Sequence, residues 1–423
     1  MTTPQQAIPT RARIAWALFD WANSAYATLI VTFVFSTYFA LAVVGDPVRG
    51  QQLWGWAASA SGLAVAVLAP VLGAVADAGG RRKPWLFGFT AFAAVGTALL
   101  WSTHADPSFI AWAMLWYAVG NLGIEFGVVF ANAMLPDLVP RDRIGRWSGW
   151  AWGLGYAGGI ASMVVALLAF VQAERPLFGL DKATFEHIRA VAPLAALWLI
   201  VFATPLFLFT PDRAGNGGGI FRHTVDGLRM LRDTVRVARQ HTNIVRFLIA
   251  NMIFLDGLVT VFVVGGIFAA GAFGMSQTEV LTFGIVLNLT GGIGAAAFGF
   301  VDDRIGPKRT ILLALVGLFV TAAGAVAAPS ATWFWIFGSA LGLFVGPVQA
   351  AGRSMMARLV PPGQSTEFFG LFALAGKATA FIGPGVVATI TAVTGSQRWG
   401  MSVLLLFFVV GGLLLLTVRE PRD

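Results

Sequence analysis

The sequence reads GAVADAGGRRK at residues 73–83 and GFVDDRIGPKR at residues 299–309, and these two stretches decide the fold. When they are aligned, a glycine, a valine, an aspartate, a second glycine and a closing pair of basic residues coincide. Each stretch follows one long apolar run and precedes another. The chain is therefore predicted to contain two copies of one helical unit in parallel orientation, as in carriers whose two halves rock around a central site.

The repeated loops also predict a mechanical role. In the first copy, Asp77 precedes a tight Gly-Gly turn that is followed by three cations, so a carboxylate and its counter-charges can link the ends of neighbouring helices. Such a network can latch one state of a two-state cycle. The residues expected to act in gating are Gly73, Asp77, Arg81, Arg82, Lys83, Asp303, Lys308 and Arg309.

The composition is that of a membrane protein. Only 11% of the residues are charged and 57% are hydrophobic, whereas roughly a quarter of the residues of a soluble domain are charged. The chain has no cysteine, which excludes disulfides, cysteine-ligated metals and a cysteine nucleophile. The formal charge of +8 is scattered over short loops without a nucleic-acid-binding motif, so we expect no nucleic-acid partner.

Apolar runs between charged or Pro/Gly-bearing turns predict twelve membrane-spanning helices. They lie near 14–44, 53–75, 85–104, 108–135, 147–172, 190–210, 244–270, 279–301, 310–328, 332–358, 364–388 and 397–417. The turn Ala328-Pro329-Ser330 divides a charge-free stretch that is too long for one span. We expect an all-α integral membrane protein with two six-helix halves, residues 1–210 and 244–423.

The segment 211–243 that joins the halves has flexible glycines and then apolar residues at helical spacing with interleaved arginines. This pattern predicts a basic amphipathic helix, which lies either on the inner leaflet or in solvent as a linker. Orientation follows from the Lys/Arg bias, because 22 basic residues fall in the connections on the side of the N-terminus and 5 in those on the other side. Both termini are therefore predicted to be cytoplasmic.

Ionisable and amide side chains inside apolar spans mark the candidate site. A charge at the bilayer centre costs about 2.5–3.5 kcal/mol, so such groups face partners or a water-filled cavity. The candidates for substrate binding and proton coupling are Asp20, Asn23, Asn121, Glu125, Asp256, Gln349, Arg353 and Lys377. We expect Glu125 or Asp256 to exchange the coupling proton and Lys377 to receive a substrate carboxylate. The alternative is that these charges form structural ion pairs that hold the bundle.

Several motifs are similar to one transporter family. Residues 73–83 resemble the loop signature of the major facilitator superfamily. More specifically, residues 16–26 (WALFDWANSAY), 254–261 (FLDGLVTV), 349–354 (QAAGRS) and 369–379 (FGLFALAGKAT) resemble the vacuolar amino-acid effluxer, or autophagy-related, branch and its bacterial relatives. Gly352 stands where that branch is expected to have a serine before the arginine. The resemblance implies a twelve-helix facilitator fold and efflux of amino acids.

The remaining motifs carry no separate chemistry. The G-x-G-x-x-G match at residues 153–158 lies inside an apolar helix rather than after a strand, which is typical of close helix packing. We expect no enzyme activity, cofactor or metal, and a transport cycle driven by a gradient. The leading hypothesis is a monomeric carrier of small polar solutes, above all amino acids, in the inner cell membrane. It is either a secondary transporter coupled to protons or another ion, or a uniporter. Export of amphipathic drugs or lipids is the alternative, and a non-transporting membrane receptor is the alternative of another class.

Overall fold

The computed structural model describes residues 8–79, 81–139, 144–212, 241–359, 372, 375–376 and 378–419, and the regular elements in these ranges are helices. Most of the predicted linker and the candidate site residue Lys377 lie outside the described residues. The backbones of Gly73, Asp77 and Asp303 are helical, but their side chains also lie outside the description.

Helices lie at each of the twelve predicted positions, and several predicted spans, the first and the fifth among them, contain more than one element. In the first part of the chain they are α1 (Thr10–Ala25), η1 (Tyr26–Phe33), α2 (Phe35–Tyr38), η2 (Phe39–Val43), α3 (Pro47–Gly79), α4 (Lys83–Leu99), η3 (Leu100–Ser102), η4 (Pro107–Phe109), α5 (Ile110–Leu138), α6 (Ile144–Ala166), η6 (Leu167–Val171), η7 (Leu177–Gly179), α7 (Glu186–Arg189) and α8 (Val191–Phe209). In the second part they are α10 (Thr242–Phe273), α11 (Gln277–Ile305), α12 (Pro307–Ala327), α13 (Ala331–Leu359), α15 (Ile382–Thr394) and α16 (Gln397–Leu416).

Length and composition identify these helices as membrane spans. Ten helical stretches of the described residues are long and apolar enough to cross a membrane. The 33-residue helix α3 covers the second predicted position, and the 13-residue helix α15 overlaps the end of the eleventh. The turn predicted at Ala328-Pro329-Ser330 is confirmed, because α12 ends at Ala327 and α13 begins at Ala331.

The first span is not a regular α-helix. Its segments η1 and η2 are π-helical, and a bend at Val34 separates η1 from α2. The hydroxyl of Thr32 donates to the carbonyl of Ala27, five residues earlier, at 2.8 Å, and this bond fits the wider turn. Short π-helical segments are common at functional sites because they redirect side chains within a helix.

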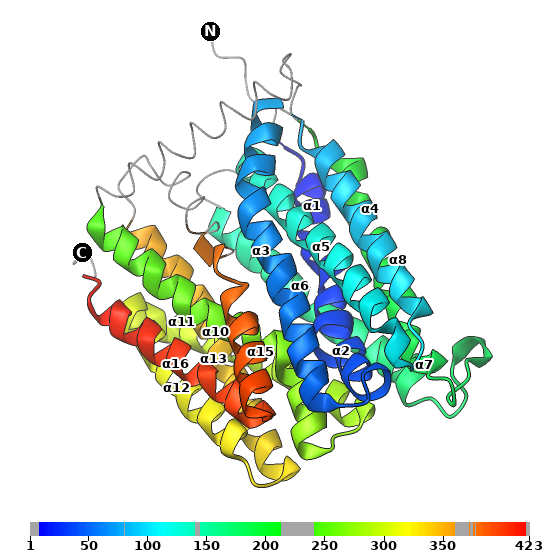
Figure 1. Cartoon of the computed structure of the whole chain (residues 1–423). Helices are drawn as coiled ribbons and strands as arrows, with labels where there is room; N and C mark the ends of the chain where they lie inside the picture. The colour runs from blue at the N-terminus through cyan, green and yellow to red at the C-terminus, as the bar shows by residue number, and fades with distance from the viewer. Residues whose placement is uncertain are drawn as a thin grey trace.

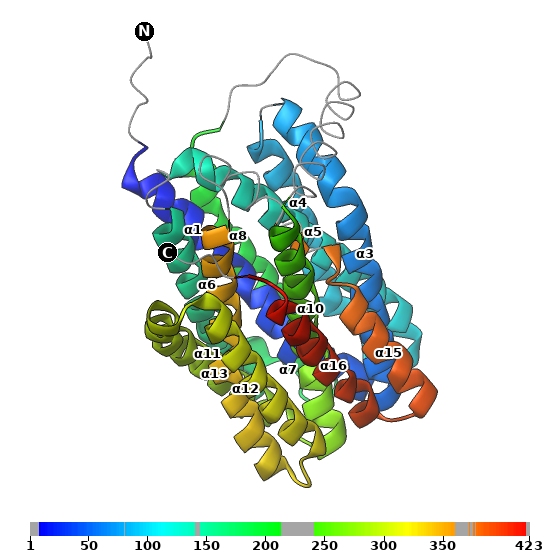
Figure 2. The same cartoon turned by 90° about the vertical axis from the view of Figure 1, so that its left-hand side faces the viewer.

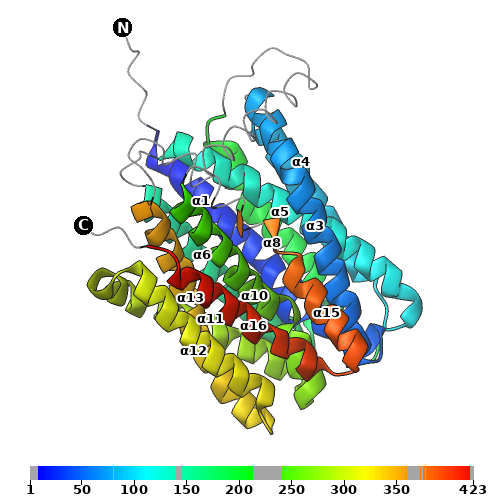
Figure 3. The ribbon, with the colours of Figure 1, turned by 60° about the vertical axis from the view of Figure 1, so that its left-hand side comes forward.

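The helices form two groups that follow the order of the chain (Figure 1). In the first group α1 packs on α6 and α8, and α4 packs on α5 and α8. In the second group α10 packs on α16, and α13 packs on α11 and α12. The groups meet where α3 contacts α15 and α10, where α6 contacts α11, and where η1 contacts α10. Figures 2 and 3 show the orange helix α15 alongside the blue helix α3.

One end of the bundle, which we call the terminal end, carries the start of α1 and the end of α16. There Arg13 donates to the carbonyl of Leu138 at the end of α5 at 3.1 Å. In the second group, the amide of Asn243 near the start of α10 donates to Arg419 O at 2.7 Å and accepts from Arg419 N–H at 2.7 Å. The start of α1 and the end of α16 thus lie at the same end of the bundle, as expected for an even number of spans.

At the opposite end, hydrogen bonds join the two groups directly. Gln51 Nε2 donates to Thr391 Oγ1 at 2.9 Å, and Gln397 Nε2 donates to Pro47 O at 3.0 Å. Beside them, Gly266 of α10 lies directly against the carbonyl of Thr32, where no larger residue would fit. We call these three contacts the opposite-end contacts, and they hold the two groups together at that end.

The eleventh span differs from the prediction of one continuous helix over 364–388. A turn at 379–381 interrupts it, α15 begins at Ile382, and the helix continues to Thr394. The physical reason is local: Pro384 has no N–H to donate to a preceding carbonyl, and the first turn of a helix accommodates a proline most easily. A helix N-terminus is thereby placed inside the bundle.

Candidate functional site

Asp256 lies in the middle of α10 and faces the beginning of α15. It is the fifteenth residue of α10, about 21 Å from the start of that helix. Its Oδ2 atom accepts the main-chain N–H of Gly383 at 3.0 Å, while its Oδ1 atom is buried without a hydrogen-bond partner among the described residues. Only 3% of the residue is exposed. A carboxylate on α10 therefore caps a helix that begins within the membrane region.

Small residues allow α3 to approach this place from the other group of helices. Ser59 Oγ donates to the carbonyl of Phe381 at 2.7 Å. Methyl groups on Gly55 and Gly62 would lie 2.9 Å and 3.1 Å from atoms of Ala388 and Phe381. We call this contact between α3 and residues 381–388 the central seam. Its small-residue spacing permits close approach of two membrane helices.

The first group contributes a polar cluster on one face of α5. Asn121 Nδ2 donates to Ser61 Oγ of α3 at 2.9 Å. Tyr26 of η1 donates its hydroxyl to the carbonyl of Tyr117 at 3.0 Å, and Tyr26 is only 2% exposed. Glu125, one turn beyond Asn121, is partly exposed and interacts electrostatically with both tyrosines. Glu125 lies in the middle of α5, as Asp256 lies in the middle of α10.

Asp20 and Arg353 lie near each other across the two groups. The side chain of Asn23 hydrogen-bonds to Asp20, and Arg353 interacts electrostatically with Asp20. The guanidinium carbon of Arg353 lies 5.5 Å from the centre of the Trp152 ring on α6, in the range of a cation–π contact. Gln349 is half-buried one turn before Arg353 on α13. The structure therefore brings Asp20, Asn23 and Arg353 together, closer to the terminal end than Asp256.

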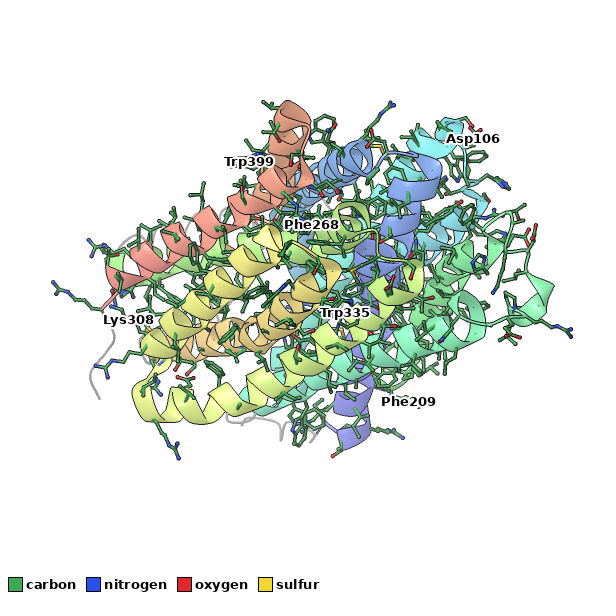
Figure 4. All side chains as sticks on the ribbon, turned by 90° about the horizontal axis from the view of Figure 1, so that it is seen from below. Asp106, Phe209, Phe268, Lys308, Trp335 and Trp399 are labelled. Carbon is green, nitrogen blue, oxygen red and sulfur yellow. The ribbon has the colours of Figure 1, made fainter. Side chains whose placement is uncertain are left out.

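The basic residues of the repeated loops bind helix ends. Lys83 Nζ donates to Phe207 O and Thr210 O at the end of α8, both at 2.7 Å. Lys308 Nζ donates in the same way to Leu416 O and Val418 O at the end of α16, at 3.0 and 2.6 Å. Figure 4 shows Lys308 extending beside the end of that helix. Lys83 and Lys308 are thus structural counterparts, one position off the sequence alignment, which pairs Lys83 with Arg309.

Two aspartates that sequence reasoning missed complete the first loop. Arg82 Nη1 forms an ion pair with Asp137 Oδ2 of α5 at 3.0 Å, and it also donates to Ala133 O. The carboxylate of Asp212 accepts the main-chain N–H groups of Arg82 at 3.0 Å and of Lys83 at 3.3 Å. Asp212 therefore caps α4 and joins it to the end of α8. A cleft lined by Arg81, Lys83, Pro84, Phe87, Phe207 and Asp212 opens beside these contacts, within the first group.

The geometry separates the candidate residues into three sets. Glu125 and Asn121 belong to the first group, Asp256 belongs to the second group at the central seam, and Asp20 with Arg353 connects the groups nearer the terminal end. Sequence reasoning missed Ser59, Gly383 and Tyr117. The sequence Gly383-Pro384-Gly385 was the one available signal, since such residues mark a break or start in a helix.

Comparisons with known proteins agree with this architecture. The chain is 25% identical over 419 residues to the uncharacterized MFS-type transporter YxiO of Bacillus subtilis (strain 168), covering 98% of this chain and 96% of that protein. It is 30% identical over 300 residues to the autophagy-related protein 22-1 of Penicillium rubens, covering 66% of this chain and 49% of that protein. The chain thus matches about half the length of this fungal relative.

Solved structures show the same fold at low sequence identity. A bacterial homolog of the human lysosomal transporter Spinster superposes with a TM-score of 0.70 at 14% identity, covering 100% of both chains. A D-xylose-proton symporter superposes with a TM-score of 0.68 at 12% identity, covering 97% of this chain and 98% of that one.

The all-helical fold, the membrane spans and these relatives define a multi-pass membrane transporter of the major facilitator fold. The family described as "Vacuole effluxer Atg22 like" matches residues 56–423. The chain belongs to that family, which confirms the resemblance seen in its motifs.

Proposed function

We propose that this chain moves small polar solutes, above all amino acids, by alternating access and couples that movement to protons. The observation that carries the proposal is the carboxyl group of Asp256. It is buried in the middle of a membrane helix, and among the described residues it has one main-chain partner, which leaves its other oxygen without one. Buried acids of this kind are unfavourable in a membrane and are typical of ion pathways and proton relays.

The polar cluster of the first group supports a zwitterionic substrate. Glu125 and the amide of Asn121 can receive an ammonium group, and Lys377, which we predict from the sequence alone, can receive a carboxylate. Asp20 and Arg353 connect the groups nearer the terminal end, where we propose that they regulate access. The names of the fungal relatives refer to autophagy and the family description to a vacuole effluxer, which supports efflux as the direction of transport.

Alternating access requires contacts that form at one end while those at the other end break. The opposite-end contacts join the two groups in this structure through Gln51, Gln397 and Gly266. We place the terminal end in the cytoplasm of a cell whose inner membrane holds the protein, because the arginine-rich connections lie there. Lys83 and Lys308 then bind helix ends on the cytoplasmic side, where they favour one arrangement of each half.

Solute flux through the purified protein in proteoliposomes tests this proposal. A panel of labelled amino acids, sugars, nucleosides and amines is followed in counterflow and then under an imposed pH gradient. We expect counterflow of amino acids and pH-driven accumulation that a protonophore abolishes, with accumulation reduced in Glu125→Gln or in Asp256→Asn. Absence of counterflow for every solute would contradict a carrier, and accumulation that is insensitive to the protonophore would contradict proton coupling.

A further inference from the structure

The first turn of α15 has a single main-chain donor that is directed out of the helix. The N–H groups of Ile382 and Gly385 donate to the carbonyls of Thr379 and Phe381 at 2.8 and 3.3 Å, and Pro384 has no N–H. The N–H of Gly383 is the remaining donor, and it bonds to the carboxylate of Asp256. Helix N-termini stabilise anions through such donors and through the helix dipole. A carboxylate of the chain itself therefore occupies an anion-binding position.

Two buried polar atoms point to a second occupant. Asp256 is 3% exposed and its Oδ1 atom has no partner among the described residues. Thr379 Oγ1, in the turn that precedes α15, is also buried without a partner there. A purely structural cap is made equally well by a neutral Asn or Ser. A charged cap with one unpartnered oxygen is unfavourable inside a membrane. We infer that the charge is retained because it serves another state of the protein.

Among the described residues, the surroundings of Asp256 hold no counter-charge, and we infer that protonation neutralises it. Helix α15 has no ionisable residue, and the other helices packed on α10 have theirs near their ends or on other faces. In the described residues these are Arg49 of α3, Glu279, Asp302 and Arg304 of α11, Arg353 and Arg358 of α13, Arg398 of α16, Tyr26 of η1 and Tyr38 of α2, with Arg246 on α10 itself. No charge among them acts on Asp256, whose electrostatic environment is set by burial and by Gly383.

We propose that the N-terminus of α15 is the carboxylate subsite of the transporter, and that Asp256 occupies it until a proton and a substrate carboxylate arrive together. This inference rests on the proposed transport function, and it assigns the substrate carboxylate to the start of α15 in place of Lys377. Asp256 takes one proton from water and loses its charge, and the substrate carboxylate then accepts the N–H of Gly383 and the hydroxyl of Thr379. Two carboxylates cannot both stay ionised at this distance. One proton therefore accompanies each carboxylate, and the substrate class is monocarboxylates, zwitterionic amino acids included.

The close fit around Gly383 defines the shape of this subsite. A methyl group on Gly383 would overlap the Thr260 hydroxyl and lie 3.0 Å from both the main-chain oxygen and the Oδ1 atom of Asp256. Only glycine lets these oxygens approach the helix N-terminus.

Equilibrium binding to the purified full-length protein tests the subsite. The probes are the amino acids, short monocarboxylates and the amide of each acid, and binding is measured between pH 5.5 and 8. In the wild type we expect binding of acids and not of amides, tightening by up to about tenfold per pH unit on acidification, as linkage to one proton requires. Asp256→Asn is uncharged at every pH and is expected to bind the same acids with no dependence on pH.

Controls separate this inference from folding and from the transport proposal. Asp106→Asn makes the same chemical change at an exposed cap and should keep the pH dependence. Thr379→Val is expected to weaken the binding of acids about tenfold with an unchanged pH slope. The subsite would be overturned if amides bound as tightly as acids, or if acid binding to Asp256→Asn kept the pH dependence of the wild type. It would also be overturned if Lys377→Gln, and not the variants at the start of α15, lost the preference for acids. Counterflow of sugars or amines without carboxylates would leave the carrier intact and overturn only the subsite.

Discussion

The carboxylate of Asp256 and the main-chain amide of Gly383 form a hydrogen bond of 3.0 Å that connects the middle of α10 to the beginning of α15. Gly383 permits this bond because its missing side chain leaves room for Thr260 Oγ1. Asp256, which we propose as the coupling acid, therefore acts on a helix end, and that helix forms the central seam with α3. A change of charge at Asp256 can in this way alter the contact between the two groups of helices.

Gly383→Ala is predicted to destabilise the protein by about 1–3 kcal/mol, because a forced side chain displaces packed atoms. Thermal unfolding in detergent measures the change. Gly88→Ala is the matched control, since a methyl group there meets no atom within 4 Å, and it should leave stability unchanged or raise it by up to about 1 kcal/mol. Adding Thr260→Ala to Gly383→Ala should recover part of the loss. Equal stability of the two single glycine variants would show that α15 does not approach α10 as closely as described.

The double variant Ser59→Cys/Gly385→Cys is predicted to form a disulfide across the central seam. A methyl group on Gly385 would lie 3.4 Å from Ser59 Cβ, close to the usual spacing of about 3.5–4.5 Å between bridged Cβ atoms. The chain has no cysteine of its own, so no other thiol competes. Oxidation should stop counterflow and reduction should restore it, while each single variant stays active under oxidant. Full flux through the cross-linked protein would mean that the central seam does not open during transport.

The opposite-end contacts are predicted to set how often that end opens. Gln51→Leu combined with Gln397→Leu removes two hydrogen bonds between the groups, and the net value of about 1 kcal/mol for each shifts the population of open molecules about tenfold or more. A reporter cysteine at Ser36, which is fully buried, should then react that much faster with an impermeant maleimide. Gln172→Leu, at an exposed position, is the control and should change nothing.

Membrane orientation is predicted from the arginine bias alone. A cysteine at Asn216, in the segment that joins the halves, should be protected from an impermeant maleimide added to intact cells and should react after permeabilisation. A cysteine at Phe178, in a connection predicted to be outside and 89% exposed, should react without permeabilisation. The reverse pattern would invert the assignment of the terminal end to the cytoplasm.

The sequence predicted the spans well because hydropathy alone determines where a chain can cross a membrane. It also identified Asp256 and Glu125, since an acid within an apolar helix is visible in the sequence. It did not predict the partner of Asp256, because a main-chain N–H has no sequence signature and the expected partner was a cation. The partners of Lys83 and Lys308 were missed for the same reason, since they are carbonyls at helix ends.

The local departures from regular helix were also beyond the sequence patterns. The π-helical segment Tyr26–Phe33 has the same apolar composition as an α-helix, and its wider turns depend on how η1 fits against α10. The break before Ile382 lies in a uniformly apolar stretch, where only Gly383-Pro384-Gly385 indicated it. The division at residues 210 and 244, and the amphipathic helix between them, stay predictions.

The central claim, that Asp256 couples proton entry to transport, is tested most directly by comparing two fluxes through Asp256→Asn in proteoliposomes. One is accumulation of an amino acid under a pH gradient, and the other is counterflow of the same amino acid at equal pH. The asparagine can still accept the N–H of Gly383 but cannot release a proton. We predict that accumulation is lost while counterflow continues at a rate comparable to that of the wild type. Accumulation at the wild-type level in Asp256→Asn would contradict the claim.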